Sequence, residues 1–454
     1  PEYLQIPRST EAEVYDFIYA ELEDIKDDLK DNNDSKTRAN YYTVLALESR
    51  AMLYAGSLAK YNNLMDNPIT LPGGEVGIPA GRANEFYTRS LKASQEILQN
   101  GNYALYDKNP DRGMNFYEML MDKNSNEVIF AKDFENSLKT HGFTFENIPR
   151  SLTEDNEYPS NLTPSLNLVE SFEYLDGSDG ELRITDASGS PIVYDELTGI
   201  FDNKDPRLYG TVIYPGTSFR GLQVSLQAGV AVWNGSGYSF QTSQDLGSVY
   251  SFPDGSGDGG LWTGADGPQD NAQFVSNTGF YIRKFLSDAS GASTRGVASE
   301  NWWPWFRLGE IYLNGAEAAY ELGQTETATT YINTLRERAG FPANSITNLT
   351  MEDIRNERRV ELAFEDHRFF DLKRWRIAHE IWDGDESSEK AVVYGLYPYR
   401  IFRPGHPDNN HYIYNRMRPT RFRRARLFRL GNYYASIDQG VLNNNPKLVR
   451  NPFH

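Results

Sequence analysis

The chain has 454 residues, a net charge of −18, a pI near 4.9 and no cysteine. The missing cysteine excludes disulfides, thiolate nucleophiles and Cys-ligated metals, and the acidic charge disfavours nucleic acid as a partner, because phosphate binding needs a positive surface. No apolar run approaches the roughly 18 residues that a membrane-spanning helix needs.

The two ends of the chain differ from this average. The opening Pro1-Glu2-Tyr3-Leu4 does not resemble a signal peptide, so we expect either a mature N-terminus or a missing upstream portion. Residues 397–454 hold ten Arg and one Lys against two Asp, or +9. We expect this segment to pair with the acidic remainder rather than to bind phosphates.

The first hundred residues are predicted to be helical. Thr10 and Glu13 form a capping box, followed by one apolar stripe, which predicts a helix over residues 10–30. Further helices are expected from about 38 to 61 and from 84 to 100, the last ending at Gly101. We expect these two to form an antiparallel pair joined by a Pro/Gly-rich loop.

The middle of the chain changes character. Residues 127–131 are predicted to form a short buried strand, whereas residues 147–299 are rich in Gly, Ser, Asp and Asn and show no sustained period. Scattered large aromatic residues argue for order in this stretch. Because long irregular segments in ordered proteins are usually functional, we expect the ligand surface here.

Signatures of enzymes and cofactors are weak. Residues 255–260 satisfy G-x-G-x-x-G, but without a preceding strand or a following helix. A calcium loop that starts at Asp254 has Ala265 where a bidentate Glu is required. His379-Glu380 lacks the second His of a zinc pair, and no G-x-S-x-G elbow occurs. We therefore predict no cofactor and no enzyme, while a looser calcium site stays open that would use Asp254, Asp258, Asp266 or Asp270.

The most informative stretch lies between residues 301 and 375. Trp305, Leu308, Gly309 and Tyr312 fit W-x2-L-G-x2-Y, the signature of a tetratricopeptide helix pair, which we expect over residues 303–339. Small residues let the two helices approach closely. We expect the tryptophans of this region to pack rather than to bind ligand: Trp302, Trp303, Trp305 and Trp375.

Residues 357–368 mix carboxylates, arginines and one histidine, which at first suggests catalysis. Opposite charges three and four residues apart on a helix more often brace the helix and its neighbours. We interpret the segment as a structural ion-pair network.

Residues 306–375 closely resemble the SusD/RagB family of Bacteroidota outer-membrane nutrient-binding lipoproteins. The resemblance is carried by Arg307-Leu308-Gly309-Glu310-Ile311-Tyr312-Leu313-Asn314, Ala316-Glu317-Ala318, Ile332-Asn333, Arg336, Arg338, Glu357-Arg358-Arg359, Glu361-Leu362-Ala363-Phe364-Glu365, His367-Arg368 and Phe370-Asp371-Leu372-Lys373-Arg374-Trp375. Weaker similarity is found at Pro7-Arg8-Ser9-Thr10, Asp205-Pro206-Arg207-Leu208 and residues 445–452.

The resemblance implies a mostly α fold in which tetratricopeptide-like helix pairs form a right-handed superhelical scaffold beside a loop-rich, irregular ligand-binding region. It also implies a lipid-anchored protein on the extracellular face of the outer membrane. Such a protein captures oligosaccharides, or in some branches peptides, for a SusC-like TonB-dependent transporter. The sequence differs from the family pattern at its start, where the lipidated Cys and the early helices are not found.

We divide the chain into an N-terminal helical part (1–130), a loop-rich ligand-binding part (131–300), a tetratricopeptide-like part (301–380) and an irregular C-terminal part (381–454), expected to form one compact unit. Flat aromatic rings suit the apolar faces of sugars, and polar side chains suit their hydroxyls. The candidate ligand-binding residues are Trp262, Trp233, Tyr250, Tyr238, Tyr281, Asp266, Asn234 and Arg283. A protein–protein scaffold, a peptide binder and, less favoured, a glycoside hydrolase remain alternatives.

Overall fold

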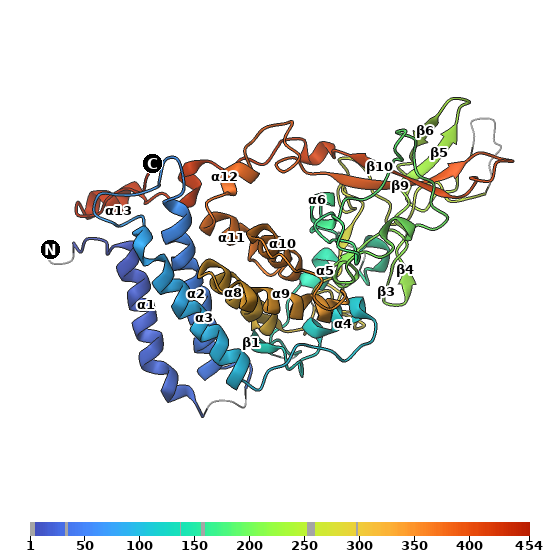
Figure 1. The fold of residues 1–454 in the computed structure, drawn as a ribbon. Helices are drawn as coiled ribbons and strands as arrows, with labels where there is room; N and C mark the ends of the chain where they lie inside the picture. Colours follow the sequence, from blue (N-terminus) through green and yellow to red (C-terminus); the bar gives the residue numbers. More distant parts are fainter. Residues whose placement is uncertain (1–4, 32–34, 137, 156–158, 252–258, 297) are drawn as a thin grey trace.

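The computed structural model describes residues 5–31, 35–136, 138–155, 159–251, 259–296 and 298–454. Figure 1 shows a helical half that holds both chain ends and a loop-rich half with short strands. The α-helices are α1 Glu11–Ile25, α2 Tyr41–Asn62, α3 Ala83–Asn100, α4 Arg112–Met121, α5 Phe143–Asn147, α6 Leu166–Val169, α7 Arg207–Thr211, α8 Leu308–Glu321, α9 Thr325–Ala339, α10 Met351–Glu361, α11 Arg368–Arg374, α12 Ala378–Ile381 and α13 Gln439–Asn444.

The strands are short and lie mostly in the second half of the chain. They are β1 Val128–Lys132, β2 Val212–Ile213, β3 Ser218–Phe219, β4 Leu222–Gln223, β5 Gly229–Trp233, β6 Tyr238–Gln241, β7 Tyr281–Ile282, β8 Trp303–Arg307, β9 Gly395–Phe402 and β10 Tyr412–Met417. Single 3₁₀ turns are η2 Lys26–Leu29, η3 Ala80–Arg82, η4 Arg150–Leu152, η5 Gly199–Phe201, η6 Thr420–Phe422 and η7 Leu430–Tyr433.

The three N-terminal helices form where the sequence predicts them. The Thr10 hydroxyl accepts a hydrogen bond from the Glu13 amide at 3.1 Å, and the Glu13 carboxylate accepts one from the Thr10 amide at 2.8 Å, which completes the capping box of α1. Helix α3 ends before Gly101 as predicted, but Gly101 does not adopt the left-handed conformation of a C-terminal glycine cap. Gly101 has φ −78°, and a Cβ there would lie 2.6 Å from the carbonyl oxygen of Ile97.

The predicted helix pair of residues 303–339 is α8 and α9. A Cβ on Gly315 would lie 3.0 Å from the Tyr331 ring, so this glycine allows the close approach of the two helices. The pair begins later than predicted. Trp303–Arg307 is strand β8, which pairs antiparallel with the predicted strand β1, because long-range pairing overrides the helical pattern.

Helices α2, α3, α8 and α9 pack against one another in that order. Their shared core includes Met52, Leu53, Phe86, Leu313 and Ile332, all fully buried. About 36% of the described residues are helical, and the architecture is a helical half beside a loop-rich half. Among the described residues, no helix has both the length and the apolar content that crossing a membrane requires.

The C-terminal part contains a feature that the sequence analysis misses. Residues 381–454, expected to be irregular, contribute β9 and β10 to a four-stranded sheet of order β10-β9-β5-β6, in which β5 and β9 are parallel. Every residue of β9 is buried, so no polar alternation marks the strand, and Pro398 within it argues against a central strand.

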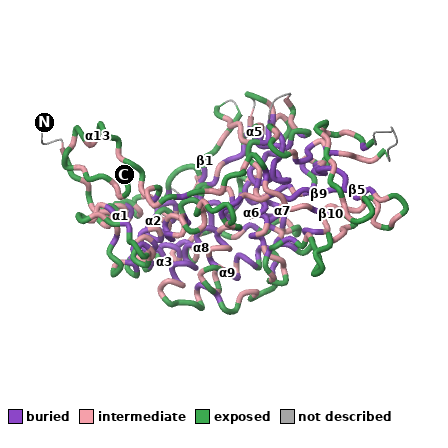
Figure 2. Tube along the Cα trace, turned by 90° about the horizontal axis from the view of Figure 1, so that it is seen from above, coloured by how far each residue is buried: buried purple, intermediate pink, exposed green. Residues whose placement is uncertain are grey.

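Figure 2 shows the buried residues running through the middle of the molecule, from α2 and α8 to α6, α7 and β9, with exposed loops around them. Near the N-terminus, Arg8 donates a hydrogen bond to the Asn451 side chain at 2.8 Å, so the two chain ends meet.

Candidate functional site

The charged segment of α10 forms a buried ion-pair network. The carboxylate of Glu361 accepts hydrogen bonds from Arg207 at 2.8 Å, from Arg307 at 2.7 Å and from Arg338. Burial alone would raise the pKa of Glu361, but the three guanidinium charges hold this pKa well below its ordinary value. The structural interpretation of Glu361 is therefore confirmed.

A second cluster links α8 and α11 with α10, whose Arg358 pairs with Asp371 at 3.3 Å. Arg374 donates to Glu317 at 2.7 Å and to Asp371 at 2.8 Å, and the Trp375 indole donates to Glu317 at 2.8 Å. All four side chains are buried. Because these charges are matched and hydrogen-bonded to one another, the cluster fixes the orientation of the helices rather than presenting a reactive group.

His367 is a buried titratable group of this region whose pKa is shifted by its surroundings. Burial lowers its pKa to about 4, against the opposing charge of Glu310. The imidazole is therefore neutral in the folded protein, and the stability that it contributes is complete above pH 6.5 and is lost as the pH falls toward 4.

We expect the free energy of unfolding to fall between pH 7 and pH 4.5. The fall should be about 2 kcal/mol smaller for His367→Leu than for the wild type. Urea unfolding of both proteins across this pH range measures the difference. Parallel pH profiles for the two proteins would contradict the prediction.

Four of the eight predicted ligand-binding residues are buried, so no ligand can touch their side chains. Asp266 accepts two hydrogen bonds from Ser151, and Tyr281 donates to the Asp266 carbonyl oxygen at 3.1 Å. The Arg283 guanidinium lies 4.1 Å from the centre of the Tyr209 ring. Tyr250 packs between Trp262 and Phe402. These four side chains pack inside the irregular segment and stabilise it. The prediction that they lie on an exposed ligand-binding surface was therefore wrong.

The other four remain accessible. Trp233 and Tyr238 face each other across the β5–β6 hairpin with ring centres 5.2 Å apart, and the Arg403 guanidinium lies 4.1 Å from the centre of the Trp233 ring. Asn234 is exposed at the turn of the same hairpin. Trp262 is half-buried, and its indole N–H has no hydrogen-bond partner among the described residues.

The tryptophans expected to pack do so with one exception. Trp302 and Trp375 are buried, and Trp303 stacks on Phe285 with ring centres 4.1 Å apart. Trp305 is 48% exposed and lies beside two cavities of about 320 and 370 Å³. Trp303 and Trp305 lie two residues apart on the same face of β8, where Trp303 is half-buried against Phe285 and Trp305 is exposed.

The structure tests only part of the calcium hypothesis, because Asp254 and Asp258 lie outside the described residues. Asp266 is buried against Ser151, and Asp270 accepts hydrogen bonds from the amide and hydroxyl of Thr420, both at 2.6 Å. No group of three metal-ligating side chains occurs within the described part of the chain.

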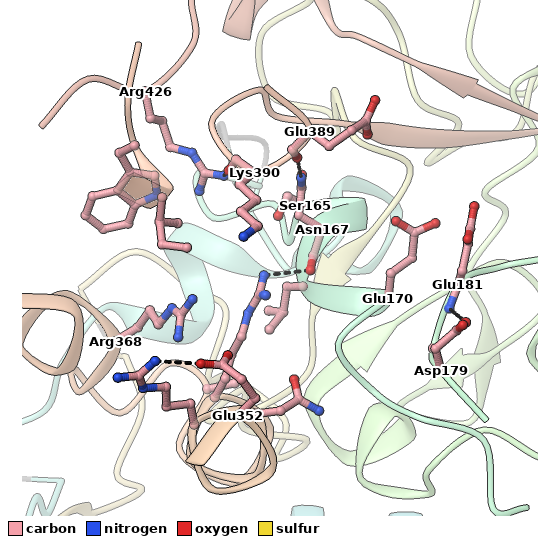
Figure 3. A pocket seen from close by; sticks show the side chains of 18 of the residues that line it. Ser165, Asn167, Glu170, Asp179, Glu181, Glu352, Arg368, Glu389, Lys390 and Arg426 are labelled. Carbon is pink, nitrogen blue, oxygen red and sulfur yellow. Dashed lines mark hydrogen bonds and ion pairs between the residues drawn. The ribbon is translucent and has the colours of Figure 1, made fainter. Parts of the chain in front are cut away.

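A cavity of about 930 Å³ lies between α6, α10, α11 and the segment 381–426. Figure 3 shows this cavity with its charged side chains. Its lining comprises Ser165, Asn167, Leu168, Glu170, Asp179, Gly180, Glu181, Glu352, Arg355, Asn356, Arg359, Ala363, Phe364, Arg368, Ile381, Trp382, Glu389, Lys390, Arg416 and Arg426.

Most of the residues that line this cavity are polar or charged, and one contributes an indole ring. Trp382 is half-buried and stacks on Phe369 at 6.3 Å between ring centres. Arg416, from the basic C-terminal segment, pairs with Glu389 at 2.7 Å and with Glu170 at 3.8 Å, as expected for that segment. Burial raises the pKa of Glu170, and the Arg416 charge lowers it less. Sequence reasoning missed this cavity because its walls come from four separated segments.

Comparison with known proteins identifies the family. Residues 126–454 match the SusD family. The chain belongs to the SusD family.

Two curated relatives come from Formosa agariphila. SusD-like protein P2 is 36% identical over 115 residues, and SusD-like protein P25 is 41% identical over 106 residues. Each alignment covers 22% of this chain, and 22% and 20% of the respective relative, so the similarity spans about a fifth of these proteins.

Solved structures share the fold over nearly the whole chain. A SusD-like protein of Bacteroides fragilis gives a TM-score of 0.64 at 22% identity and covers 99% of this chain and 72% of the other. A SusD-like carbohydrate-binding protein of the same species gives 0.63 at 20% identity, covering 98% and 72%. A structure determined with a xylogluco-oligosaccharide gives 0.55 at 14% identity, covering 97% and 70%. At these identities the likeness concerns the fold.

Proposed function

We propose that this protein captures an oligo- or polysaccharide without cleaving it and delivers it to a SusC-like TonB-dependent transporter. It acts on the extracellular face of the outer membrane, held by a lipid anchor outside residues 1–454. Family membership supports this proposal, as do the structural neighbours described as carbohydrate-binding or solved with a xylogluco-oligosaccharide. In this proposal α2, α3, α8 and α9 belong to a tetratricopeptide-like, right-handed superhelical scaffold.

The cavity of about 930 Å³ is the observation that carries the proposal, because ligand pockets commonly measure about 300–1,000 Å³. Its carboxylates, amides and guanidinium groups match the many donors and acceptors of a sugar. Trp382 offers a flat ring to the apolar face of a sugar ring. The helical half contributes rigid walls, so the site is largely preformed.

Trp233, Tyr238, Asn234 and Trp262 form a second, outlying contact for a long polymer in this proposal. Trp233 contacts both Tyr238 and Arg403, and these contacts hold its ring before binding, so little side-chain entropy is lost. Trp262 contributes its half-buried ring to this contact, while its indole N–H is buried without a hydrogen-bond partner among the described residues.

A binding screen over purified polysaccharides and peptides tests the function. We expect saturable binding to at least one glycan, no binding to peptides and no release of reducing sugar. Glu170 is the cavity carboxylate with a raised pKa, so release of reducing sugar that Glu170→Gln abolishes would favour a glycoside hydrolase instead.

Trp233→Ala and Trp262→Ala are each expected to weaken polymer binding about threefold to tenfold, the size of one aromatic contact. Short oligosaccharides that fill only the cavity should bind both variants normally. Isothermal titration with long and short forms of the same glycan measures this. Trp305→Ala is the matched control, because Trp305 is an exposed tryptophan on a different sheet. An equal loss in the control would contradict the proposed contact.

A further inference from the structure

One side of this cavity gathers four cationic side chains. Arg359 on α10, Arg368 on α11, and Lys390 and Arg426 from the following segment line it. Figure 3 shows Arg368, Lys390 and Arg426 pointing toward one another, with Glu170, Asp179 and Glu181 on the opposite side. None of the four cations forms an ion pair with a described residue, and the side chains of Arg368 and Lys390 form no hydrogen bond there either.

The hydrogen bonds that exist do not neutralise this charge. Arg359 donates to the carbonyl oxygen of Asn167 at 2.6 Å, and Arg426 donates to the carbonyl oxygens of Ala391 at 3.1 Å and Lys390 at 2.8 Å. Backbone carbonyl groups are neutral, so these hydrogen bonds leave the positive charges in place. The carboxylates of Asp371 and Glu352 act on Arg368 without forming an ion pair with it.

This group of four cations in the cavity wall is unusual for this chain. Asp and Glu outnumber Lys and Arg by 63 to 45, and Arg358 and Arg374 on the same two helices are each paired with Asp371. Burial, followed by the charges of Arg368 and Arg426, lowers the pKa of Arg359 to about 9. Repulsion among these positive charges therefore destabilises the folded protein, and a bound anion would reduce this repulsion.

We infer that the cationic side of this cavity binds an anionic group of the captured glycan, either the carboxylate of a uronic acid or a sulfate ester. This inference rests on the proposed glycan-capturing function. Guanidinium groups bind both anions through paired N–H donors, and Lys390 adds a mobile point charge. Glu170, Asp179 and Glu181 accept hydrogen bonds from neutral sugar hydroxyls on the opposite side and disfavour a densely charged polyanion such as nucleic acid.

Two matched ligand pairs test the inference by isothermal titration at low salt. One pair is oligogalacturonate and its methyl ester, and the other is κ-carrageenan oligosaccharides and their desulfated form. We expect the charged member of at least one pair to bind about tenfold or more tightly than its neutral partner, and its affinity to fall as salt is raised. The pair that shows the difference identifies the anion as carboxylate or sulfate.

Arg368→Met and Lys390→Met are the informative variants, because neither side chain forms a hydrogen bond or an ion pair with a described residue. We expect each to weaken binding of the charged glycan about tenfold, to leave neutral glycans unaffected, and to keep or raise the melting temperature as like-charge repulsion is relieved. Arg424→Met is the control, since Arg424 is an exposed arginine of the same segment outside the cavity.

The outcomes separate the inference from the proposed function. Equal or tighter binding of the neutral members overturns the inference while the glycan-capturing function stands. Charged-glycan binding that survives both cavity variants, or is lost equally in Arg424→Met, also overturns it. Absence of binding to all four ligands counts against the inference, and the polysaccharide and peptide screen then decides whether the function falls with it.

Discussion

Replacing Glu361 by alanine is expected to cost about 3–5 kcal/mol of the free energy of unfolding, the range for breaking a buried ion pair from one side. Three buried guanidinium groups, those of Arg207, Arg307 and Arg338, share this carboxylate. They come from α7, β8 and α9, so the loss of Glu361 leaves uncompensated charge where three elements meet α10. Urea unfolding followed by far-UV circular dichroism measures the loss.

A surface ion pair provides the comparison. Asp107 pairs with Arg112, and their side chains are 62% and 34% exposed. Asp107→Asn should therefore cost less than about 1 kcal/mol. If Glu361→Ala and Asp107→Asn lower the free energy of unfolding by similar amounts, the buried network has no special structural role.

Trp382→Ala is expected to weaken glycan binding about 30-fold, the loss typical of a central aromatic anchor that costs about 2 kcal/mol when truncated. Trp382 lines the large cavity and is held by Phe369 and by Phe428, whose ring centres lie 6.3 Å from that of Trp382. Because neighbouring rings fix the indole, little entropy is lost when a sugar ring stacks on it.

The companion variants separate binding from folding. Trp382→Phe keeps a flat ring and should retain most of the affinity, whereas Trp382→Leu keeps apolar volume without a ring and should not. Melting temperatures of all three variants identify any loss of fold. If Trp382→Leu binds glycan as tightly as the wild type, the cavity is not the main ligand site.

Much of the helical half could be predicted from the sequence. The capping box of α1, the apolar stripe behind it and the tetratricopeptide signature of α8 all depend on neighbours within one or two helical turns. Strand β8 could not be predicted in the same way, because its conformation depends on pairing with β1 about 175 residues earlier in the chain. Strand β9 was hidden for a related reason, since a strand buried on both sides shows no alternation.

The candidate site was less predictable than the fold. Aromatic residues in an irregular segment could be recognised as important, but sequence alone did not distinguish Trp233, which lies at a surface hairpin, from Tyr281, which is buried. The same holds for charge: Arg358 is neutralised in the core, whereas the adjacent Arg359 faces the cavity.

The sequence by itself determined the family and the helix pairs, because local spacing encodes these features. It also indicated a structural role for the charges of α10, although their partners lie on α7, β8 and α9. Only the tertiary structure decided which rings are exposed, which arginines lack carboxylates and where the large cavity lies. Each of these features depends on contacts between side chains from distant segments of the chain. Local sequence patterns do not reveal such contacts.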